Sequence, residues 1–387
     1  MTNPPSLENI LVLDMTEAMA GPYAGMMLGD LGADVIKIER AGKGDMARGW
    51  GPPFANGESG YFLSVNRNKK SLTLNLKDEQ AREVFHKLIA SADIFLVNQP
   101  RLASLQRLQA DYETLSAINP RLIYCAISGY DLAAQGESGT MALTGEPDGP
   151  PVRYPVPISD ITAGLYTTMS ALTALYVREQ SGRGQFIDVS LLDSQITWLT
   201  NLAGAYFVSG ERPSRLGNFH PQISPYEVFQ AADKAFLVAV GSERLWANFC
   251  EAIGVADTIG VDPRYTTNVD RLEHRMELHN ALLGVFTSQP ADFWLDRLRE
   301  AGIPCGPINE IDETLSDPHV LARGMVVDME HPTAGDIRVI GNPMKLSDTP
   351  PSYRLPPPIL GQHTDEILRD LGYSAEKIVT LRENGVV

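Results

Sequence analysis

The 387-residue sequence has little cysteine and no long apolar run. Its three cysteines, Cys125, Cys250 and Cys305, are far apart and leave an odd one over, so neither a disulfide framework nor a zinc knuckle is indicated. No segment approaches the ~20 consecutive apolar residues of a membrane span, and the first residues lack the pattern of a targeting peptide. These absences predict a cytoplasmic protein in a reducing compartment.

Common catalytic motifs are missing as well. The sequence has no HExxH, Walker A or GxSxG pattern, and the glycines of "AGKGD" (41–45) lack the spacing of a phosphate-binding loop. The seven histidines show no useful metal-ligand spacing. We therefore expect no metal and no permanently bound cofactor.

The charge is strongly acidic but unevenly distributed. A formal net charge of -16 disfavours nucleic acid as a partner. Residues 37–70 nevertheless carry seven basic side chains against three acidic ones. This window indicates either a site for a small anionic ligand, such as a coenzyme phosphate, or a solvated surface.

The first half of the chain alternates strand and helix patterns. Strands are expected at residues 10–15, 33–39, 93–98, 121–128 and 185–193, and helices at 21–32, 78–92, 111–118 and 160–180. This order predicts an α/β fold with a Rossmann-like parallel sheet covered by helices on both faces. Ligands of such sheets bind at the carboxyl ends of the strands.

The second half of the chain differs in composition from the first. A Gly, Pro and Ser-rich stretch precedes a strand pair and three helices, which indicates a smaller α+β domain. We predict a large domain at 1–195, a linker at 196–215, the small domain at 216–308, and a proline-rich strap that returns to the large domain at 309–387. The strap is expected to be extended rather than disordered.

Asp160 stands out by its setting in "VPISDITAGLY" (156–166), where a proline-broken stretch gives way to a long apolar helix. Aspartate is a favoured helix N-cap, and the helix dipole stabilises its charge there. A catalytic carboxylate is the alternative. Periodicity does not separate the two interpretations.

Several longer motifs resemble one family. They are "MAGPYAGMMLGDLGADVIKIERAGKGDMARGWGP" (19–52), "NRNKKSLTLNL" (66–76), "DGPPVRYPVPISDITAGLY" (148–166) and "SGRGQFIDVSLLDSQ" (181–195). In this order they resemble the family III CoA-transferases, and the likeness runs from about residue 10 to 385. The resemblance implies a ring-shaped chain that forms an interlocked homodimer. It also implies a large domain that binds CoA, with acyl-CoA and a small carboxylic acid as substrates.

The resemblance also implies roles for single residues. Asp160 falls on the catalytic aspartate that forms anhydride and thioester intermediates, and a carboxylate with a pKa of about 4 would be ionised and nucleophilic at neutral pH. The implied coenzyme contacts, with the last two less firmly placed, are Ala20, Arg40, Asn98, Arg107, Lys43 and Tyr130.

Substrate contacts are less specific. Met19 stands where formyl-CoA transferases have a catalytic glutamine, which argues against a formyl or oxalyl substrate. The second half is closest to transferases that use succinyl-CoA and dicarboxylic acceptors, for which Arg48 and Arg153 are candidate anchors of a second carboxylate. His220 is either a lid or acceptor-pocket residue or a structural histidine in a turn.

One departure from the family follows Tyr130. Related sequences have an additional loop there, whereas this sequence continues directly into Asp131. Either the loop is deleted or the sequence omits a mobile segment, and the second interpretation is favoured. Racemases of the same fold, such as alpha-methylacyl-CoA racemase, use a histidine at the position of Tyr130. The alternatives to CoA transfer are therefore acyl-CoA racemisation, which the tyrosine disfavours, and a catalytically silent CoA-binding paralogue.

Overall fold

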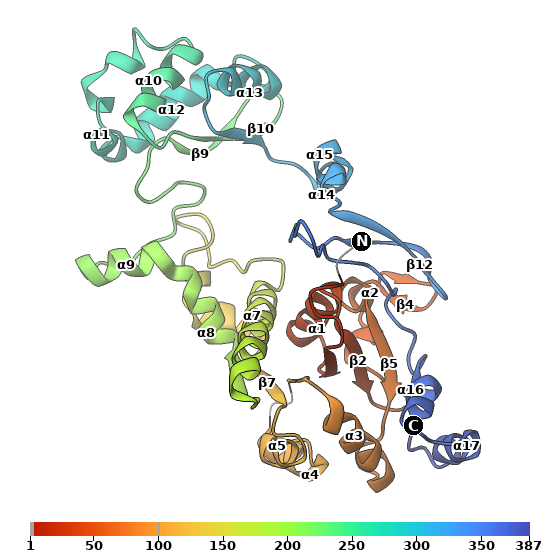
Figure 1. Ribbon diagram of the computed structural model, residues 1–387. Helices are drawn as coiled ribbons and strands as arrows, with labels where there is room; N and C mark the ends of the chain where they lie inside the picture. Colours follow the sequence, from red (N-terminus) through yellow and green to blue (C-terminus); the bar gives the residue numbers. More distant parts are fainter. Residues whose placement is uncertain (1–3, 99–100) are drawn as a thin grey trace. The chain divides into compact units, whose positions relative to one another are not determined.

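The computed structural model describes residues 4–98 and 101–387, which form two compact units (Figure 1). Unit 1 comprises Met1–Thr140, Arg153–Val208 and Pro318–Val387, and unit 2 comprises Met141–Val152 and Ser209–Asp317. Unit 2 therefore extends further than the small domain predicted at 216–308, and it includes a short segment that the sequence did not assign to it. No helix in the described part of the chain is long and apolar enough to cross a membrane.

Unit 1 is built on a six-stranded parallel sheet, as predicted, with the order β5-β2-β1-β6-β7-β8. Its strands are β1 (Leu11–Met15), β2 (Asp34–Glu39), β5 (Lys69–Thr73), β6 (Ile94–Val97), β7 (Ile123–Ser128) and β8 (Phe186–Ser190). Only β5 was not expected, because its sequence KKSLT begins with two lysines and has too few apolar residues to form a pattern.

Helices α1 (Ala20–Asp30) and α7 (Ile158–Ser181) lie side by side on one face of this sheet (Figure 1). The alternation of side chains along a strand directs Val12 of β1 to this face, where it packs with Leu28 of α1 and Ala171 of α7. Helix α7 ends at Gly182, whose φ of 70° places it in the left-handed region that favours glycine.

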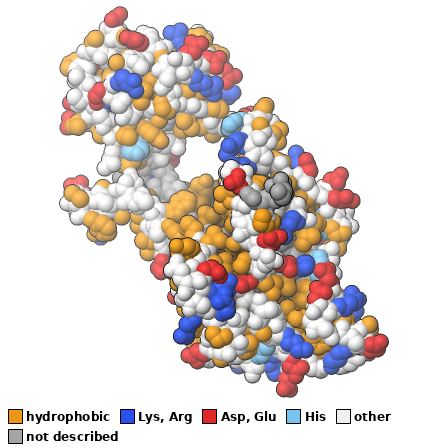
Figure 2. Space-filling model, in the orientation of Figure 1, with side chains coloured by type: hydrophobic (Ala, Val, Ile, Leu, Met, Phe, Trp, Pro, Cys, Tyr) orange, Lys and Arg blue, Asp and Glu red, His pale blue; other side chains and the backbone are white. Residues whose placement is uncertain are grey.

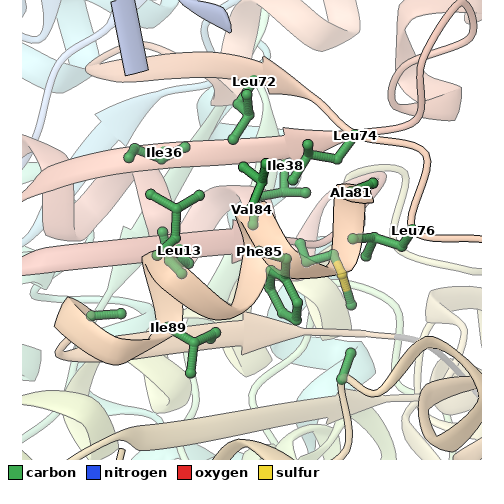
Figure 3. Close-up of a cluster of buried hydrophobic side chains, with 14 of the residues drawn as sticks. Leu13, Ile36, Ile38, Leu72, Leu74, Leu76, Ala81, Val84, Phe85 and Ile89 are labelled. Carbon is green, nitrogen blue, oxygen red and sulfur yellow. The ribbon is translucent and has the colours of Figure 1, made fainter. Parts of the chain in front are cut away.

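The opposite face carries the larger core. It is covered by α3 (Glu79–Ser91), α5 (Tyr112–Ile118), α16 (Thr364–Asp370) and α17 (Ala375–Glu383). Figure 3 shows Leu13, Ile36 and Leu72 of three neighbouring strands with Val84 and Phe85 of α3. All five are buried, and burial of each such side chain contributes about 1.5–3 kcal/mol.

Shorter elements complete unit 1. They are η1 (Met46–Gly49), β3 (Phe54–Ala55), β4 (Glu58–Ser59), α2 (Gly60–Val65), α4 (Leu102–Leu108), α6 (Asp131–Glu137), α8 (Leu191–Ile196), η3 (Thr197–Leu199), α9 (Thr200–Ser209), α15 (Pro318–Ala322), β12 (Val326–His331) and β13 (Gly335–Ile340). The short helix η2 (Thr140–Ala142) spans the boundary in the chain between units 1 and 2. The predicted linker at 196–215 is thus largely helical. Strands β12 and β13 pair as an antiparallel hairpin.

The proline-rich strap runs along α1 and the start of β5. Asn68 donates its backbone N–H to the carbonyl of Leu355 at 2.8 Å. The Arg354 Nη2 donates to the carbonyls of Gly29 at 2.9 Å and Ala33 at 2.7 Å. The strap is therefore extended and bound to unit 1, as its composition predicts.

Unit 2 is a small α+β body with its own aromatic core. Its antiparallel sheet has the order β11-β10-β9, and Phe236, Phe249, Phe286 and Trp294 are buried among its helices. The elements are β9 (Tyr226–Gln230), β10 (Ala235–Ala239), α10 (Glu243–Ala252), η4 (Ile259–Val261), η5 (Pro263–Tyr265), α11 (Asn268–Glu273), α12 (Arg275–Phe286), α13 (Ala291–Glu300), β11 (Cys305–Pro307) and α14 (Ile311–Ser316). Helices α11 and α12 are separated only by His274.

Candidate active site

Three buried carboxylates on or near α1 each have a cation partner, and we call these the floor pairs. They are Asp14 with Lys69 at 2.8 Å, Asp45 with Lys37 at 2.8 Å, and Asp30 with Arg67 at 2.6 Å. Burial would raise the pKa of Asp14, but the lysines Lys69 and Lys37 lower it to about 2. The basic window at 37–70 is therefore not a surface patch, because three of its seven cations are buried in these pairs.

The floor pairs hold the turn between β1 and α1. Lys37 Nζ donates to the carbonyl of Thr16 at 2.8 Å, and Asp45 Oδ1 accepts the N–H of Ala18 at 3.1 Å. Ala18 has a φ of 70°, an unfavourable conformation for a residue with a side chain. These contacts fix where α1 begins, so the first N–H groups of α1 have a defined direction.

Asp160 is the third residue of α7 and does not cap that helix. The N-cap is Pro157, which offers no side-chain acceptor. The N–H of Ser159 is instead accepted by Oδ1 of Asp131, the first residue of α6, at 2.8 Å. The interpretation of Asp160 as the cap of its own helix is wrong, because the carboxylate of Asp131 takes the capping role.

The Asp160 carboxylate turns to the neighbouring helix. The backbone N–H of Ala20, the first residue of α1, stabilises its charge and lowers its pKa, and α1 has no side-chain cap of its own. Gly164 makes this approach possible, since a Cβ there would lie 2.7 Å from the Ala20 carbonyl oxygen and 3.0 Å from the ring of Tyr23. Asp160 thus lies at the positive end of the α1 dipole as well as in the first turn of α7.

The surroundings make Asp160 a weak acid. Burial raises its pKa and the nearby charge of Asp131 raises it further, while the Ala20 N–H lowers it, with a result of about 7. The expected pKa of about 4 is therefore wrong. The carboxylate is about half protonated at neutral pH, and its ionised form is a stronger base than an ordinary aspartate.

A tyrosine that the sequence did not single out faces this acidic group. Burial raises the pKa of Tyr61 on α2, and the charges of Asp160, Asp131 and Asp45 raise it further. Its phenol therefore stays protonated and can donate a hydrogen bond. The ring is held edge-on against Trp50, with the centroids 4.8 Å apart. The one sequence signal for Tyr61 is that it lies a few residues before the family motif "NRNKKSLTLNL" (66–76).

Comparison with known proteins identifies the family of this chain. The model of CoA-transferase family III matches residues 7–364. This chain belongs to that family. It is 40% identical to the succinyl-CoA:glutarate CoA-transferase of Mus musculus over 98% of this chain and 90% of the relative. It is 39% identical to the succinate–glutarate CoA-transferase of Agrobacterium fabrum over 95% of this chain and 96% of the relative.

A solved structure gives the same result for the fold. A CAIB/BAIF family protein from Brucella suis superposes with a TM-score of 0.86 at 36% identity, covering 95% of this chain and all of the other. The protein is therefore a CoA-transferase that acts on CoA thioesters. These relatives do not favour the racemase or the silent paralogue.

The transferase gathers two of the expected coenzyme residues at the carboxyl ends of β1, β2 and β6. Asn98 accepts the N–H of Glu17 at 3.1 Å and donates to its carbonyl at 2.8 Å. The Arg40 Nε donates to the Glu17 carboxylate at 3.0 Å, and 60% of the arginine side chain is exposed. Lys43 lies exposed in the turn that follows β2.

Arg107 and Tyr130 lie on other elements of unit 1. Arg107 is on α4, where its Nη2 donates to Ser104 at 3.3 Å, and Tyr130 is 75% exposed just before α6. The structure joins β7 to α6 directly through Gly129 and Tyr130.

The expected substrate residues have diverse settings. Met19 is buried immediately before Ala20. The Arg48 guanidinium is held by both oxygens of Glu39 at 2.8 Å and covers the Phe62 ring at 3.7 Å, so this geometry gives no support to its role as a carboxylate anchor. Arg153 is exposed on the segment that leads to α7.

His220 belongs to unit 2 and closes a turn there. Its Nδ1 accepts the N–H of Gln222 at 3.1 Å, its ring lies 4.9 Å from that of Tyr226, and its carbonyl accepts from Arg275 at 2.7 Å. Burial lowers its pKa and the Arg275 charge lowers it further. The histidine is therefore neutral at physiological pH, in a position that serves the local fold.

Proposed function

We propose that this enzyme transfers CoA from succinyl-CoA to a dicarboxylic acid such as glutarate, with Asp160 as the covalent nucleophile. The observation that carries the proposal is the Asp160 carboxylate at the first N–H of α1, close to strand ends where the α/β fold binds ligands. The substrates are suggested by the names of relatives at 39–40% identity over nearly the whole chain.

The reaction begins when an Asp160 oxygen attacks the thioester carbonyl. The C–S bond breaks, CoA thiolate leaves, and a mixed anhydride joins Asp160 to the succinyl group. The thiolate then attacks the Asp160 carbonyl, which releases succinate and leaves an aspartyl thioester of CoA. The acceptor carboxylate reverses these two steps: it displaces the thiolate, and the thiolate then takes the new acyl group and frees Asp160.

The local electrostatics suit such a nucleophile. A raised pKa makes the ionised Asp160 more nucleophilic than an exposed carboxylate, because basicity and nucleophilicity rise together. The N–H groups at the start of α1 are preorganised donors for the oxyanion that develops during attack. The protonated phenol of Tyr61 is a further donor on the same side.

The coenzyme is proposed to extend from Ala20 across the strand ends. The exposed guanidinium of Arg40 and the amino group of Lys43 are available to CoA phosphates, and Asn98 holds the turn beside them. Arg107 is proposed as a more distant phosphate contact. The place of Tyr130 before α6 is compatible with a contact to the pantetheine arm.

The second carboxylate of the acceptor needs a cation near Asp160. Arg153 is the remaining candidate from the sequence, since it is exposed seven positions before Asp160 in the chain, whereas Arg48 is occupied by Glu39. We propose that Met19 contacts the acceptor's apolar chain.

One experiment tests the function. Purified protein is mixed with succinyl-CoA and a panel of mono- and dicarboxylic acids, and new acyl-CoA is measured by chromatography. We expect transfer to dicarboxylates. Asp160→Asn should lower kcat by about a thousandfold or more, while Arg40→Ala should raise KM for succinyl-CoA by about tenfold with kcat retained. A matched change at the exposed Asp193 of α8, Asp193→Asn, should have no effect.

Two results decide the outcome. An intact-mass increase equal to CoA minus water after incubation with succinyl-CoA alone supports the aspartyl thioester, provided that it is absent from Asp160→Asn. Transfer at the wild-type rate by Asp160→Asn would show that another group is the nucleophile.

We also propose that two copies form an interlocked homodimer. Apolar side chains are exposed over α7, as Figure 2 shows, and on α9, where Phe207 and Val208 are 80% and 91% exposed. Such surfaces indicate a protein partner. Sedimentation should give a dimer that survives extended dilution. A stable monomer would contradict this proposal without affecting the nucleophile.

A further inference from the structure

The carboxylate of Asp131 is the second acidic group at the start of α7, and the reaction described above gives it no role. Its Oδ1 accepts the Ser159 N–H at 2.8 Å, and its Oδ2 accepts from Gln135 Nε2 at 2.8 Å. Both oxygens are thus engaged by donors. Ser159 directly precedes Asp160, so the position of the nucleophile depends on this contact.

The network continues on both sides of Asp131. Gln135 Oε1 accepts the N–H of Tyr154 at 2.9 Å, which ties α6 to the segment that leads to α7. The Ser159 hydroxyl donates to Gln195 Oε1 of α8 at 2.9 Å. Gln135, Ser159 and Gln195 are 1%, 0% and 2% exposed. The first turn of α7 is therefore braced from two elements by buried, satisfied polar groups.

A neutral side chain could have taken the place of Asp131 in this hydrogen-bond network. Asparagine and serine cap helices about as well as aspartate, and each accepts the same N–H. The charge of Asp131 instead raises the free energy of an ionised Asp160, since like charges repel. A charge that stabilises the helix start but opposes ionisation of the nucleophile points to a role in the reaction.

We propose that Asp131 is a positioning residue for CoA transfer: it fixes the first turn of α7 and holds a negative charge beside Asp160. This inference deepens the proposed function and rests on Asp160 being the nucleophile. The charge keeps the Asp160 carboxylate basic, which favours attack on a thioester. It also shifts the onset of activity to higher pH, because the protonated carboxyl is not a nucleophile.

The other groups around α7 do not supply this effect. Burial, Asp131 and the Ala20 N–H account for the pKa of Asp160, and the protonated phenol of Tyr61 faces it uncharged. The titratable residues on the elements packed against α7 that have no share in this pKa are Tyr23, Asp30, Tyr124, Cys125, Glu137, Asp188 and Asp193. Asp131 is thus the charge that a variant must remove.

The test is the pH dependence of kcat/KM for transfer from succinyl-CoA to glutarate. In the wild type the acid limb should fall near pH 7. Asp131→Asn keeps an acceptor for the Ser159 N–H and removes the charge, so the acid limb should move down by roughly one pH unit. Asp131→Ser should give the same shift through a second neutral capping side chain. Asp131→Glu retains the charge and should retain the limb, with a lower kcat from the displaced acceptor.

The control is Asp193→Asn, which makes the same charge change on α8 and should leave the limb in place. An unshifted limb in Asp131→Asn or Asp131→Ser would overturn the proposal, and so would an equal shift in Asp193→Asn. These outcomes differ from failure of the proposed function, which is transfer by Asp160→Asn. A merely structural role for Asp131 would lower kcat at every pH and leave the limb unmoved.

Discussion

Buried carboxylates have opposite electrostatic surroundings in the floor pairs and in the first turn of α7. Asp14 and Asp45 each meet a lysine ammonium at 2.8 Å, and the lysines lower the pKa of Asp14 to about 2. Asp160, in the same unit, has backbone N–H and a second carboxylate as its neighbours, and its pKa rises to about 7. No described lysine or arginine contributes to that pKa.

This difference distinguishes a structural buried carboxylate from a functional one. A paired buried charge is inert, because neither partner gains by reacting or changing protonation. An unpaired carboxylate is costly to keep ionised, and such strain is found where a protein needs a reactive group. The balance of cations in the two places therefore marks the active site more clearly than the number of acidic residues does.

The largest expected effect comes from breaking a floor pair. Lys69→Met leaves Asp14 buried without its nearest cation and should lower the free energy of unfolding by about 3–5 kcal/mol. Denaturant unfolding monitored by circular dichroism measures this loss. The double variant Asp14→Leu with Lys69→Met should recover much of it, since no charge is left unpaired.

A surface pair provides the comparison. Lys234 contacts Asp292 at 3.1 Å with both side chains largely exposed. Lys234→Met should cost about 0–1 kcal/mol. Equal losses for Lys69→Met and Lys234→Met would show that the floor pairs do not balance buried charge as described.

The next prediction concerns Asp160, where removal of the charge should raise the stability of the folded protein. Its folded-state pKa of about 7 lies above the ordinary aspartate value of 3.8, so the folded protein binds more protons than the unfolded chain between these values. Stability conferred by the protonated form is present at low pH and is lost as pH rises toward 7. Asp160→Asn should therefore be more stable than the wild type by about 4 kcal/mol at pH 8 and about equally stable at pH 4.

Thermal unfolding at the two pH values measures this difference. Asp193→Asn, on the exposed surface of α8, serves as the control and should show no pH-dependent gain. A variant Asp160→Asn that is less stable than the wild type at pH 8 would contradict the account of an uncompensated carboxylate.

The smallest effect concerns the approach of α1 to α7. In Gly164→Ala the new Cβ meets the Ala20 carbonyl, so the helices must separate and Asp160 must move from the Ala20 N–H. We expect kcat to fall by about tenfold. Gly284 lies in α12 with open space around it, and Gly284→Ala should retain full activity and gain ~0.5–1 kcal/mol in stability. Full activity in Gly164→Ala would show that the close contact is unnecessary.

The repeating strands and helices of unit 1 were predictable because their apolar residues are regular, and β5 was missed because two lysines interrupt that regularity. The position of Asp160 at a helix start also followed from sequence. Its partner helix did not, since Asp131 takes the capping role from a distant position. Charge counting at residues 37–70 overstated the number of cations available to a ligand, because the sequence does not reveal that Lys37, Arg67 and Lys69 are buried beside carboxylates.

The strap and the last two helices determine when the catalytic unit can form during synthesis. Unit 2 is almost contiguous and is complete before Pro318 is translated. Unit 1 receives Leu368 of α16 and Leu381 of α17 into its larger core only at the end. The sheet of unit 1 is therefore made early and covered last, so a nascent chain exposes one of its apolar faces until translation ends. Chaperone demand should accordingly depend on unit 1 and not on unit 2.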